Sequence, residues 1–406
     1  NFNNFSETFA TYTQSAGGYT GTNAGSITVT GAFNVTGGNQ FVVNSGGQLT
    51  VGSMSLTGGN GLLVGGNGGV ITNVNVGSGG LTLNGRTIQL NLTSVAGQKG
   101  DSLNLQGTLT NTGGSSVIQA DSTGAILSGS VTQVDLGADR ILDITGGSLA
   151  FNNSITVLGT GTTVKSGTGT LILSVTAGTN AIKLAGLSVT GGTVQWSNND
   201  QLQDTMNITN SGGQVFFNSK AETFASYTQT TTAANPNTLT TGLLTGGGGS
   251  ISITGALKVS GNGYTTSGIT ISSSSSLSAG SVDLTGATGV AVLIGGVGTA
   301  SVSQFTIGSG GLTMNGQTIN MSRAASGQLG ASINLNGDFT ASGTNRNTDR
   351  KASATPISVH LTQGGSSVAL RSAGGAWVPA ATATSGRGPC SLPGSGLDGG
   401  SDLATS

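Results

Sequence analysis

The stretch KSGTGTLILSVTAG (Lys165–Gly178), followed by LAGLSVTGGTVQWSNNDQLQD (Leu184–Asp204), contains the pattern that decides the fold. It holds short runs in which apolar and polar residues alternate, as expected of β-strands with one buried face. Glycine and threonine open the runs, and the last run, TVQW, leads into Asn198, Asn199 and Asp200. Short strands joined by Gly-rich and Asn-rich turns predict one coil of a parallel β-helix.

The same stretch resembles the autotransporter-associated β-strand repeat, also called the passenger-associated transport repeat. In that family the pattern reads roughly GTGTLTLSG, a polar turn, and then GTL-x-x-SND-x-x-LG. GTGTLILS (Gly167–Ser174), GGTVQWSNND (Gly191–Asp200) and Leu202 match this pattern, whereas NAIKLAGLSVTGG replaces the usual turn. The resemblance implies a right-handed parallel β-helix on the surface of a Gram-negative bacterium. It also implies export with an outer-membrane translocator, which is not in this chain.

Composition favours a folded, β-rich chain over a disordered or collagen-like one. Glycine provides 74 of the 406 residues, and charged residues make up 7%, against roughly 25% in a typical globular domain. The strict three-residue glycine period of collagen is absent, and the chain has only 5 prolines. A disordered chain would combine low hydrophobicity with high charge, whereas Val, Ile and Leu recur here at alternating positions. We therefore predict an all-β fold.

Charge and cysteine usage exclude several classes of protein. The chain has 13 Lys and Arg, 14 Asp and Glu, and a net charge of −1, so no basic stripe exists that would bind a nucleic acid. Cys390 is the single cysteine and cannot form an internal disulfide. The chain has no apolar run of about 18 residues, so the sequence predicts no transmembrane helix. The β-pattern is already under way at Asn1, so we expect the sequence to be processed or cut from a longer polypeptide.

Internal repetition predicts a duplicated solenoid. Three segments of the first part return later in the chain. NFSETFATYTQ (Asn4–Gln14) returns as SKAETFASYTQ (Ser219–Gln229), and AGSITVTGAFNV (Ala24–Val35) returns as GGSISITGALKV (Gly248–Val259). VGSGGLTLNGRTIQLN (Val76–Asn91) returns as IGSGGLTMNGQTINMS (Ile307–Ser322). The offset grows from 215 (222 − 7) to 231 (308 − 77), as expected when insertions enter the corners of one copy. We predict a first β-helix copy at 1–215, a second copy at 216–340 that continues the same solenoid, and a low-order tail or spacer at 341–406.

The tail is predicted from a change in composition. It holds four of the five prolines, together with His360 and Cys390, and Pro-rich chain ends rarely pack. A shifted reading frame is an alternative explanation of this segment. Before the tail, we expect coils of about 20–25 residues. Alternation predicts that the inward-facing residues include Ile27, Val29, Phe33 or its neighbours, Leu171, Leu173, Val194 and Trp196.

The densest acidic patch is QVDLGADRILDI, which carries Asp135, Asp139, Arg140 and Asp143. On a β-helix, paired carboxylates can hydrolyse glycosides or bind Ca²⁺. The short Asp motifs of polysaccharide-cleaving β-helices, with their His, Lys or Arg partners, are absent. We therefore interpret Asp139 and Arg140 as a charged corner with a local ion pair.

The other candidates for chemistry are isolated residues. Glu7 and Glu222 occupy matching places about 215 residues apart, and we interpret them as a repeated turn or edge feature rather than a shared site. His360 has no second histidine with which to build a triad or a zinc site, and Cys390 lies among Gly and Pro. Glycine runs such as GNGG lack the Lys of a phosphate loop. The sequence thus predicts no catalytic, cofactor-binding or metal-binding residue.

These observations favour a non-enzymatic cell-surface or secreted protein, a β-helical stalk or adhesin found outside the cell or on the bacterial outer surface. Its neutral walls, rich in Ser, Thr and Asn, suit a glycan or host-surface ligand, and we expect no cofactor and no nucleic-acid partner. Two alternatives stay open. One is a self-assembling extracellular fibre, a homo-oligomer or filament joined through unpaired strand edges at the β-helix ends. The other is a polysaccharide-acting β-helix enzyme.

Overall fold

The computed structural model describes residues 2–342 with gaps, together with residues 358–361. The gaps are 17–19, 23, 45, 66–70, 91–98, 121–130, 232–241, 246–247, 265–267, 272–273, 295–302, 316–317 and 322–331. The described residues form 34 strands, and none of them forms a helix long and apolar enough to cross a membrane. The chain divides between Ala225 and Ser226 into two compact units, called unit 1 and unit 2 below.

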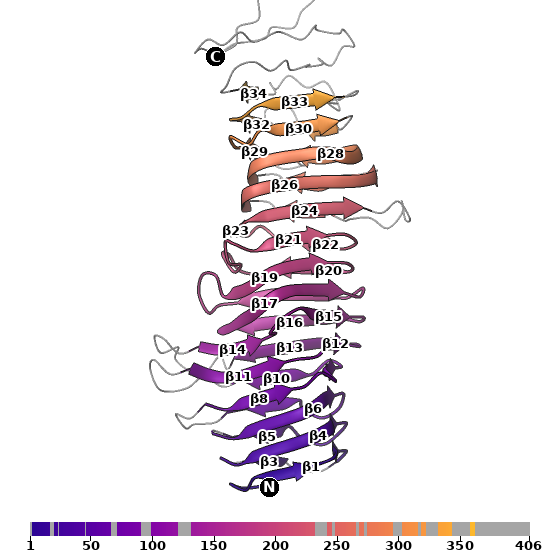
Figure 1. The fold of residues 1–406 in the computed structure, drawn as a ribbon, viewed down its shortest axis with the longest axis vertical. Coiled ribbons are helices and arrows are strands. Elements are labelled where there is room, and N and C mark those ends of the chain that lie inside the picture. Colours follow the sequence, from indigo (N-terminus) through magenta and orange to yellow (C-terminus); the bar gives the residue numbers. More distant parts are fainter. Residues whose placement is uncertain are drawn as a thin grey trace, which may run out of the picture. The chain divides into compact units, whose positions relative to one another are not determined.

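Unit 1 is a parallel β-solenoid in which each coil contributes strands to three stacks, here called walls (Figure 1). The first wall contains β1 (Glu7–Phe9), the first parts of β4 (Ser26–Val35) and β6 (Gln48–Leu56), β8 (Asn73–Val76), β11 (Lys99–Leu105), β14 (Val131–Asp135), and the first parts of β17 (Ile155–Ser166) and β19 (Ile182–Val189). The second wall contains β2 (Tyr12–Gln14), the later parts of β4, β6, β17 and β19, and β9 (Leu81–Leu83), β12 (Leu109–Asn111), β15 (Arg140–Ile144) and β21 (Asn207–Asn210).

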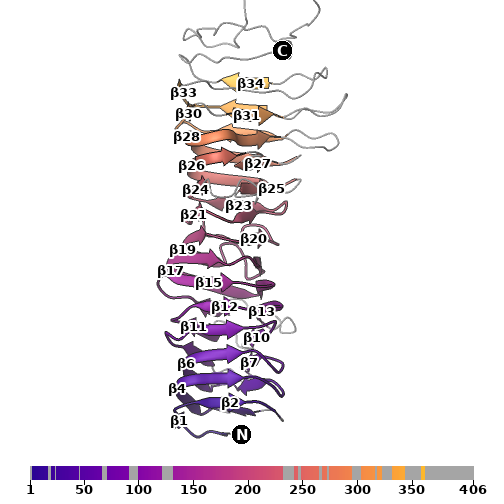
Figure 2. The ribbon, with the colours of Figure 1, turned by 90° about the vertical axis from the view of Figure 1, so that its right-hand side faces the viewer.

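The third wall of unit 1 can be followed in both views, which label several of its strands (Figure 1 and Figure 2). It contains β3 (Thr20–Thr22), β5 (Phe41–Val43), β7 (Leu62–Val64), β10 (Thr87–Leu90), β13 (Ser115–Ala120), β16 (Ser148–Asn153), β18 (Thr170–Val175), β20 (Thr193–Trp196) and β22 (Gln214–Phe216). The strand β23 (Ala221–Phe224) follows at the end of the unit.

Unit 2 repeats the same three-walled arrangement. Its first wall contains the first parts of β26 (Ser250–Tyr264) and β28 (Ser276–Ile294), β29 (Gln304–Ile307), β32 (Ser332–Leu335) and β34 (Ser358–Leu361). Its second wall contains β24 (Ser226–Thr231), later parts of β26 and β28, β30 (Leu312–Asn315) and β33 (Phe339–Ser342). Its third wall contains β25 (Gly242–Thr245), β27 (Ile269–Ile271), the end of β28 and β31 (Thr318–Met321).

The predicted fold class is confirmed, because the structure is all-β and built from parallel stacked strands. Most of the predicted tail, 341–406, lies outside the described residues. The described parts of it are the end of β33 and the strand β34, which pairs in parallel with β32.

The core lies inside the three walls and follows the alternation of the sequence. Ile27 pairs with Leu49, and Leu49 pairs with Val74, so apolar side chains stack on one another from coil to coil. The inward residues predicted from the sequence are confirmed, since each is at most 3% exposed: Ile27, Val29, Phe33, Leu171, Leu173, Val194 and Trp196. Burying each such aliphatic side chain stabilises the fold by about 1.5–3 kcal/mol.

Coil length varies more than predicted. Leu187 pairs with Ile208, 21 residues later (208 − 187), whereas Leu103 pairs with Val134, 31 residues later (134 − 103). The predicted range of about 20–25 residues was therefore too narrow. A solenoid accommodates such variation because extra residues leave at a corner without changing the pairing of the strands.

Glycine is required where one turn lies directly on the turn of the next coil. Gly147 has a φ of +63°, and a Cβ on it would lie 1.8 Å from the carbonyl oxygen of Gly114. Gly178 also has a positive φ, +119°, but a Cβ there would meet no atom within 4 Å. Comparing the two positions therefore distinguishes the effect of a positive φ, which both share, from the effect of close contact with another main chain, which only Gly147 has.

We predict that Gly147→Ala lowers the free energy of unfolding by about 1–3 kcal/mol more than Gly178→Ala does. Both changes place an Ala at a positive φ, but only the first forces two main chains apart. Urea denaturation followed by circular dichroism measures the difference. Equal losses in the two variants would show that close stacking at Gly147 contributes nothing.

Candidate functional site

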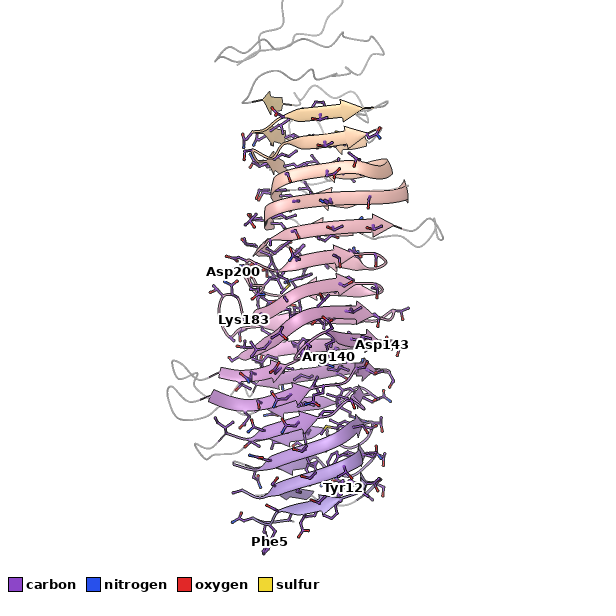
Figure 3. All side chains as sticks on the ribbon, viewed as in Figure 1. Phe5, Tyr12, Arg140, Asp143, Lys183 and Asp200 are labelled. Atoms are coloured by element: carbon purple, nitrogen blue, oxygen red, sulfur yellow. The ribbon has the colours of Figure 1, made fainter. Side chains whose placement is uncertain are left out.

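The acidic patch singled out in the sequence lies in one coil of unit 1, where Arg140 and Asp143 belong to β15 (Figure 3). Its three carboxylates accept three separate hydrogen bonds: Asp135 from the N–H of Gly137 at 2.8 Å, Asp139 from the N–H of Thr162 at 2.7 Å, and Asp143 from the hydroxyl of Ser166 at 3.0 Å. Each bond fixes a local turn or joins neighbouring coils. The structure therefore gives each carboxylate a role in the scaffold.

Arg140 holds main-chain carbonyl groups instead of the predicted ion-pair partner Asp139. Its Nε donates to the carbonyl oxygen of Leu136 at 2.8 Å, and its guanidinium also donates to the carbonyl of Gln106. Within the described part of the chain, no group of three or more His, Cys, Asp or Glu side chains could hold a metal ion. The side chain of His360 and the whole of Cys390 lie outside the described residues.

Glu222 of β23 is a buried carboxyl that caps the preceding coil. It is 2% exposed, and it accepts hydrogen bonds from the N–H of Gln201 at 2.9 and 3.1 Å and from the N–H of Leu202 at 3.2 Å. Burial raises the pKa of Glu222 to about 8, while the hydrogen bonds from Gln201 and Leu202 lower it. Glu222 opens the octapeptide ETFASYTQ (Glu222–Gln229), which repeats ETFATYTQ (Glu7–Gln14). Its counterpart in the first copy, Glu7, is exposed.

Lys165 is a buried cation that the sequence reasoning missed. It is fully buried, and its Nζ donates to the carbonyl oxygens of Ser166 at 2.7 Å and of Gly167 and Gly191 at 3.0 Å. Desolvation lowers its pKa to about 8, opposed by the charge of Asp143. The ammonium thus joins the turn of its own coil to the turn of the next.

Asn111 fills the corresponding corner of another coil in the same way. Its Nδ2 donates to the carbonyl oxygens of Gly114, Gly146 and Ser148 at 3.3, 2.8 and 3.1 Å. In the sequence, Lys165 and Asn111 each stand at an inward position immediately before a Ser-Gly or Thr-Gly-Gly turn. A polar residue at an inward position directly before a Gly-containing turn is the sequence signal that could have identified both residues as hydrogen-bond donors inside a corner.

The repeated Tyr-x-Gln of the octapeptide makes the same contacts in both units. The hydroxyl of Tyr12 donates to Oε1 of Gln14 at 3.4 Å, and that of Tyr227 to Oε1 of Gln229 at 3.0 Å. Nε2 of Gln14 donates to the carbonyl of Asn39 at 2.8 Å, and Nε2 of Gln229 to that of Gly268 at 2.9 Å. We call this arrangement the glutamine clamp.

The outer surface of the first wall of unit 1 carries two continuous rows of polar side chains, here called the polar ladder. The rows are Thr28, Thr50, Asn75, Asn104 and Asp135, and Ser26, Gln48, Asn73, Ser102, Gln133 and Thr156. In the middle of each row, two neighbours hydrogen-bond to one another: Asn104 Nδ2 donates to Asn75 Oδ1 at 2.7 Å, and Ser102 Oγ donates to Asn73 Oδ1 at 2.5 Å. These bonds hold the side chains in one orientation.

Comparisons with models of known protein families, with curated proteins and with solved structures give no match for this chain. The inference of function therefore depends on the geometry of the described residues.

We predict that the free energy of unfolding falls as the pH rises from about 4.5 to about 8 because of Glu222. In this window the carboxyl of Glu222 stays protonated in the folded chain, whose pKa is about 8, but ionises in the unfolded chain, whose ordinary value is 4.5. The unfolded state thus binds fewer protons, and stability decreases by on the order of a few kcal/mol. Urea unfolding at pH 5 and pH 8 measures the effect.

The substitution Glu222→Gln should remove most of this pH dependence, and Glu7→Gln, at the exposed counterpart, should leave it unchanged. Lys165 stays protonated in both states over most of this window and begins to lose its proton in the folded chain only near pH 8. Since the wild type and Glu222→Gln share Lys165, its contribution cancels in the comparison. A pH profile identical in the wild type and in Glu222→Gln would contradict the prediction.

A second prediction concerns the buried ammonium. Lys165→Met should lower the free energy of unfolding by about 1–3 kcal/mol, because three carbonyl groups at the corner lose their donor. Lys183→Met is the matched control at an exposed position of the same unit and should change stability by less than about 0.5 kcal/mol. Thermal or urea denaturation of the two variants measures the difference in stability. A Lys165→Met variant as stable as the wild type would show that the hydrogen bonds of the Lys165 ammonium do not stabilise the fold.

Proposed function

We propose that this chain is a non-enzymatic cell-surface or secreted β-solenoid, a stalk or adhesin whose outer walls bind a glycan or host-surface ligand. The observation that carries the proposal is the polar ladder of unit 1. Its amide and hydroxyl groups repeat at the strand spacing of about 4.8 Å, and hydrogen bonds orient those in the middle of the two rows, Asn75 with Asn104 and Asn73 with Ser102. Such a surface offers many weak, neutral hydrogen-bonding groups side by side.

The chemistry of the ladder suits sugars better than charged partners. Ten of its eleven members are uncharged (Asp135 is the exception), and most are half-buried or exposed. Amides and hydroxyls both donate and accept hydrogen bonds, as do the hydroxyl groups of a glycan. A binding surface of this kind gains affinity by engaging several sugar units along the wall at once.

The acidic patch supports the non-enzymatic proposal over a polysaccharide-acting enzyme. Hydrolysis of a glycosidic bond requires two carboxyl groups that face one substrate from opposite sides. Asp135, Asp139 and Asp143 instead hold Gly137, Thr162 and Ser166 within the scaffold. We propose an extracellular or outer-surface location on the resemblance of residues 165–204 to the autotransporter-associated repeat.

The test is a glycan panel with the double substitution Asn75→Ala and Asn104→Ala. Each lost hydrogen bond should weaken binding by about 0.5–1.5 kcal/mol, so the pair should lower affinity by roughly tenfold or more. Thr82→Ala with Thr110→Ala is the matched control, since these residues are half-buried neighbours on the second wall.

Two outcomes of this test count against the proposal. One is binding that the control weakens as much as the ladder variant does, because the ladder would then not be the binding surface. The other is turnover of an acidic polysaccharide that Asp139→Ala abolishes, which would favour the enzyme.

A further inference from the structure

One corner of unit 1, where the chain passes from the third wall to the first, joins two turns of unequal length. Leu173 pairs with Trp196, and Ile182 pairs with Leu202. One coil thus advances nine residues across the corner (182 − 173), whereas the next coil advances six (202 − 196). Since the shorter turn cannot follow the longer one residue by residue, side chains have to bridge part of the corner.

Gln201 is one of these bridging side chains. It is 1% exposed, and its Nε2 donates to the carbonyl oxygen of Val175 in the preceding coil at 2.9 Å. Nδ2 of Asn198 donates to the same carbonyl at 2.9 Å. The bond fixes the orientation of the Gln201 amide, because exchanging its oxygen and nitrogen would set two acceptor oxygens against each other. Oε1 of Gln201 is therefore the end of the amide that still requires a donor.

Three buried polar atoms at this corner have no hydrogen-bond partner among the described residues: Nε1 of Trp196, Oε1 of Gln201 and Oδ1 of Asn180. Two other buried side-chain atoms in the described part of the chain share this property, Nε of Arg86 and Oγ1 of Thr132, and they belong to other coils. Buried polar groups without a hydrogen bond are unfavourable and rare in folded proteins. Three of them at one corner indicate a partner that they share.

Main-chain contacts place the three side chains at this same corner. The N–H of Asn180 donates to the carbonyl of Asp200 at 2.9 Å, and Gln201 directly follows Asp200, which is labelled in Figure 3. Trp196 pairs with Leu173, two residues before the carbonyl that Gln201 binds. The unpartnered atoms thus belong to residues that surround one turn and the turn stacked on it.

The donor and the two acceptors match the hydrogen-bonding capacity of a water molecule. The indole N–H of Trp196 can only donate, whereas the amide oxygens of Gln201 and Asn180 can only accept. Water accepts one hydrogen bond and donates two in such a site, and buried waters in proteins typically make about three hydrogen bonds. A cation would bind the two oxygens but would be repelled by the indole N–H.

We propose that this corner of unit 1 binds one ordered water molecule, which accepts a hydrogen bond from Nε1 of Trp196 and donates to Oε1 of Gln201 and Oδ1 of Asn180. The water joins the longer turn to the shorter one where main-chain pairing does not. Gln201 also gives its main-chain N–H to Glu222 at 2.9 Å, so the water helps to hold the residue that binds this buried carboxyl. The proposal is independent of glycan binding.

The first experiment is a high-resolution crystal structure of the full chain, which requires no substitution. We expect density for one water within hydrogen-bonding distance of the three named atoms. Crystals soaked in a rubidium salt test for a monovalent cation through its anomalous scattering. A corner without water density, direct hydrogen bonds among the three side chains, or a rubidium peak between the two oxygens would overturn the proposal.

The second experiment detects the water in solution through its magnetisation transfer to the indole N–H of Trp196 in NMR spectra. The chain has 2 tryptophans, so the signal of Trp196 is assigned by its loss in Trp196→Phe. Gln201→Met, which replaces the amide by an apolar group of similar length, should abolish the transfer. Gln203→Met is the matched control, since Gln203 is half-buried nearby and donates to the carbonyl of Leu184, and it should leave the transfer unchanged.

The NMR experiment can contradict the proposal in two ways. One is a folded wild type in which the indole N–H of Trp196 receives no magnetisation from water. The other is a transfer of equal strength in the wild type and in Gln201→Met, because the water would then not depend on the Gln201 amide.

Discussion

The parallel hydrogen-bonded ladder between successive coils is the interaction on which the whole structure depends. Each coil satisfies the main-chain N–H and C=O groups of its neighbours along three walls, and this pairing places apolar side chains in line inside the walls. Charged residues make up 7% of the chain, so ion pairs contribute little, and cohesion comes from repeated pairing and burial.

Much of the fold could be predicted from local alternation. The period of two assigns Ile27, Val29 and Trp196 to the interior because neighbouring side chains on a strand point to opposite faces, and the structure confirms them. Coil length could not be predicted as well. It depends on how many residues leave the stack at each corner, and neither the hydrophobic pattern nor the turn residues limit that number.

The polar interior was the part that sequence reasoning missed. Lys165 and Glu222 stand at inward positions, yet their residue types are normally found at the surface. Their burial is tolerated because main-chain groups, some of them in other coils, satisfy them: for Lys165 the carbonyls of its own turn and that of Gly191, 26 residues away, and for Glu222 N–H groups about 20 residues away. Such partners become known only when the register between coils is known.

The glutamine clamp has a consequence for how this chain can change in length. Gln14 reaches a carbonyl 25 residues ahead (39 − 14), and Gln229 reaches its counterpart 39 residues ahead (268 − 229), with nearly the same geometry. The clamp fixes both ends of the intervening segment, whatever its size. The same contact thus closes a coil of 25 residues in unit 1 and one of 39 residues in unit 2, so a coil of this solenoid can lengthen while the contact between its two ends is kept.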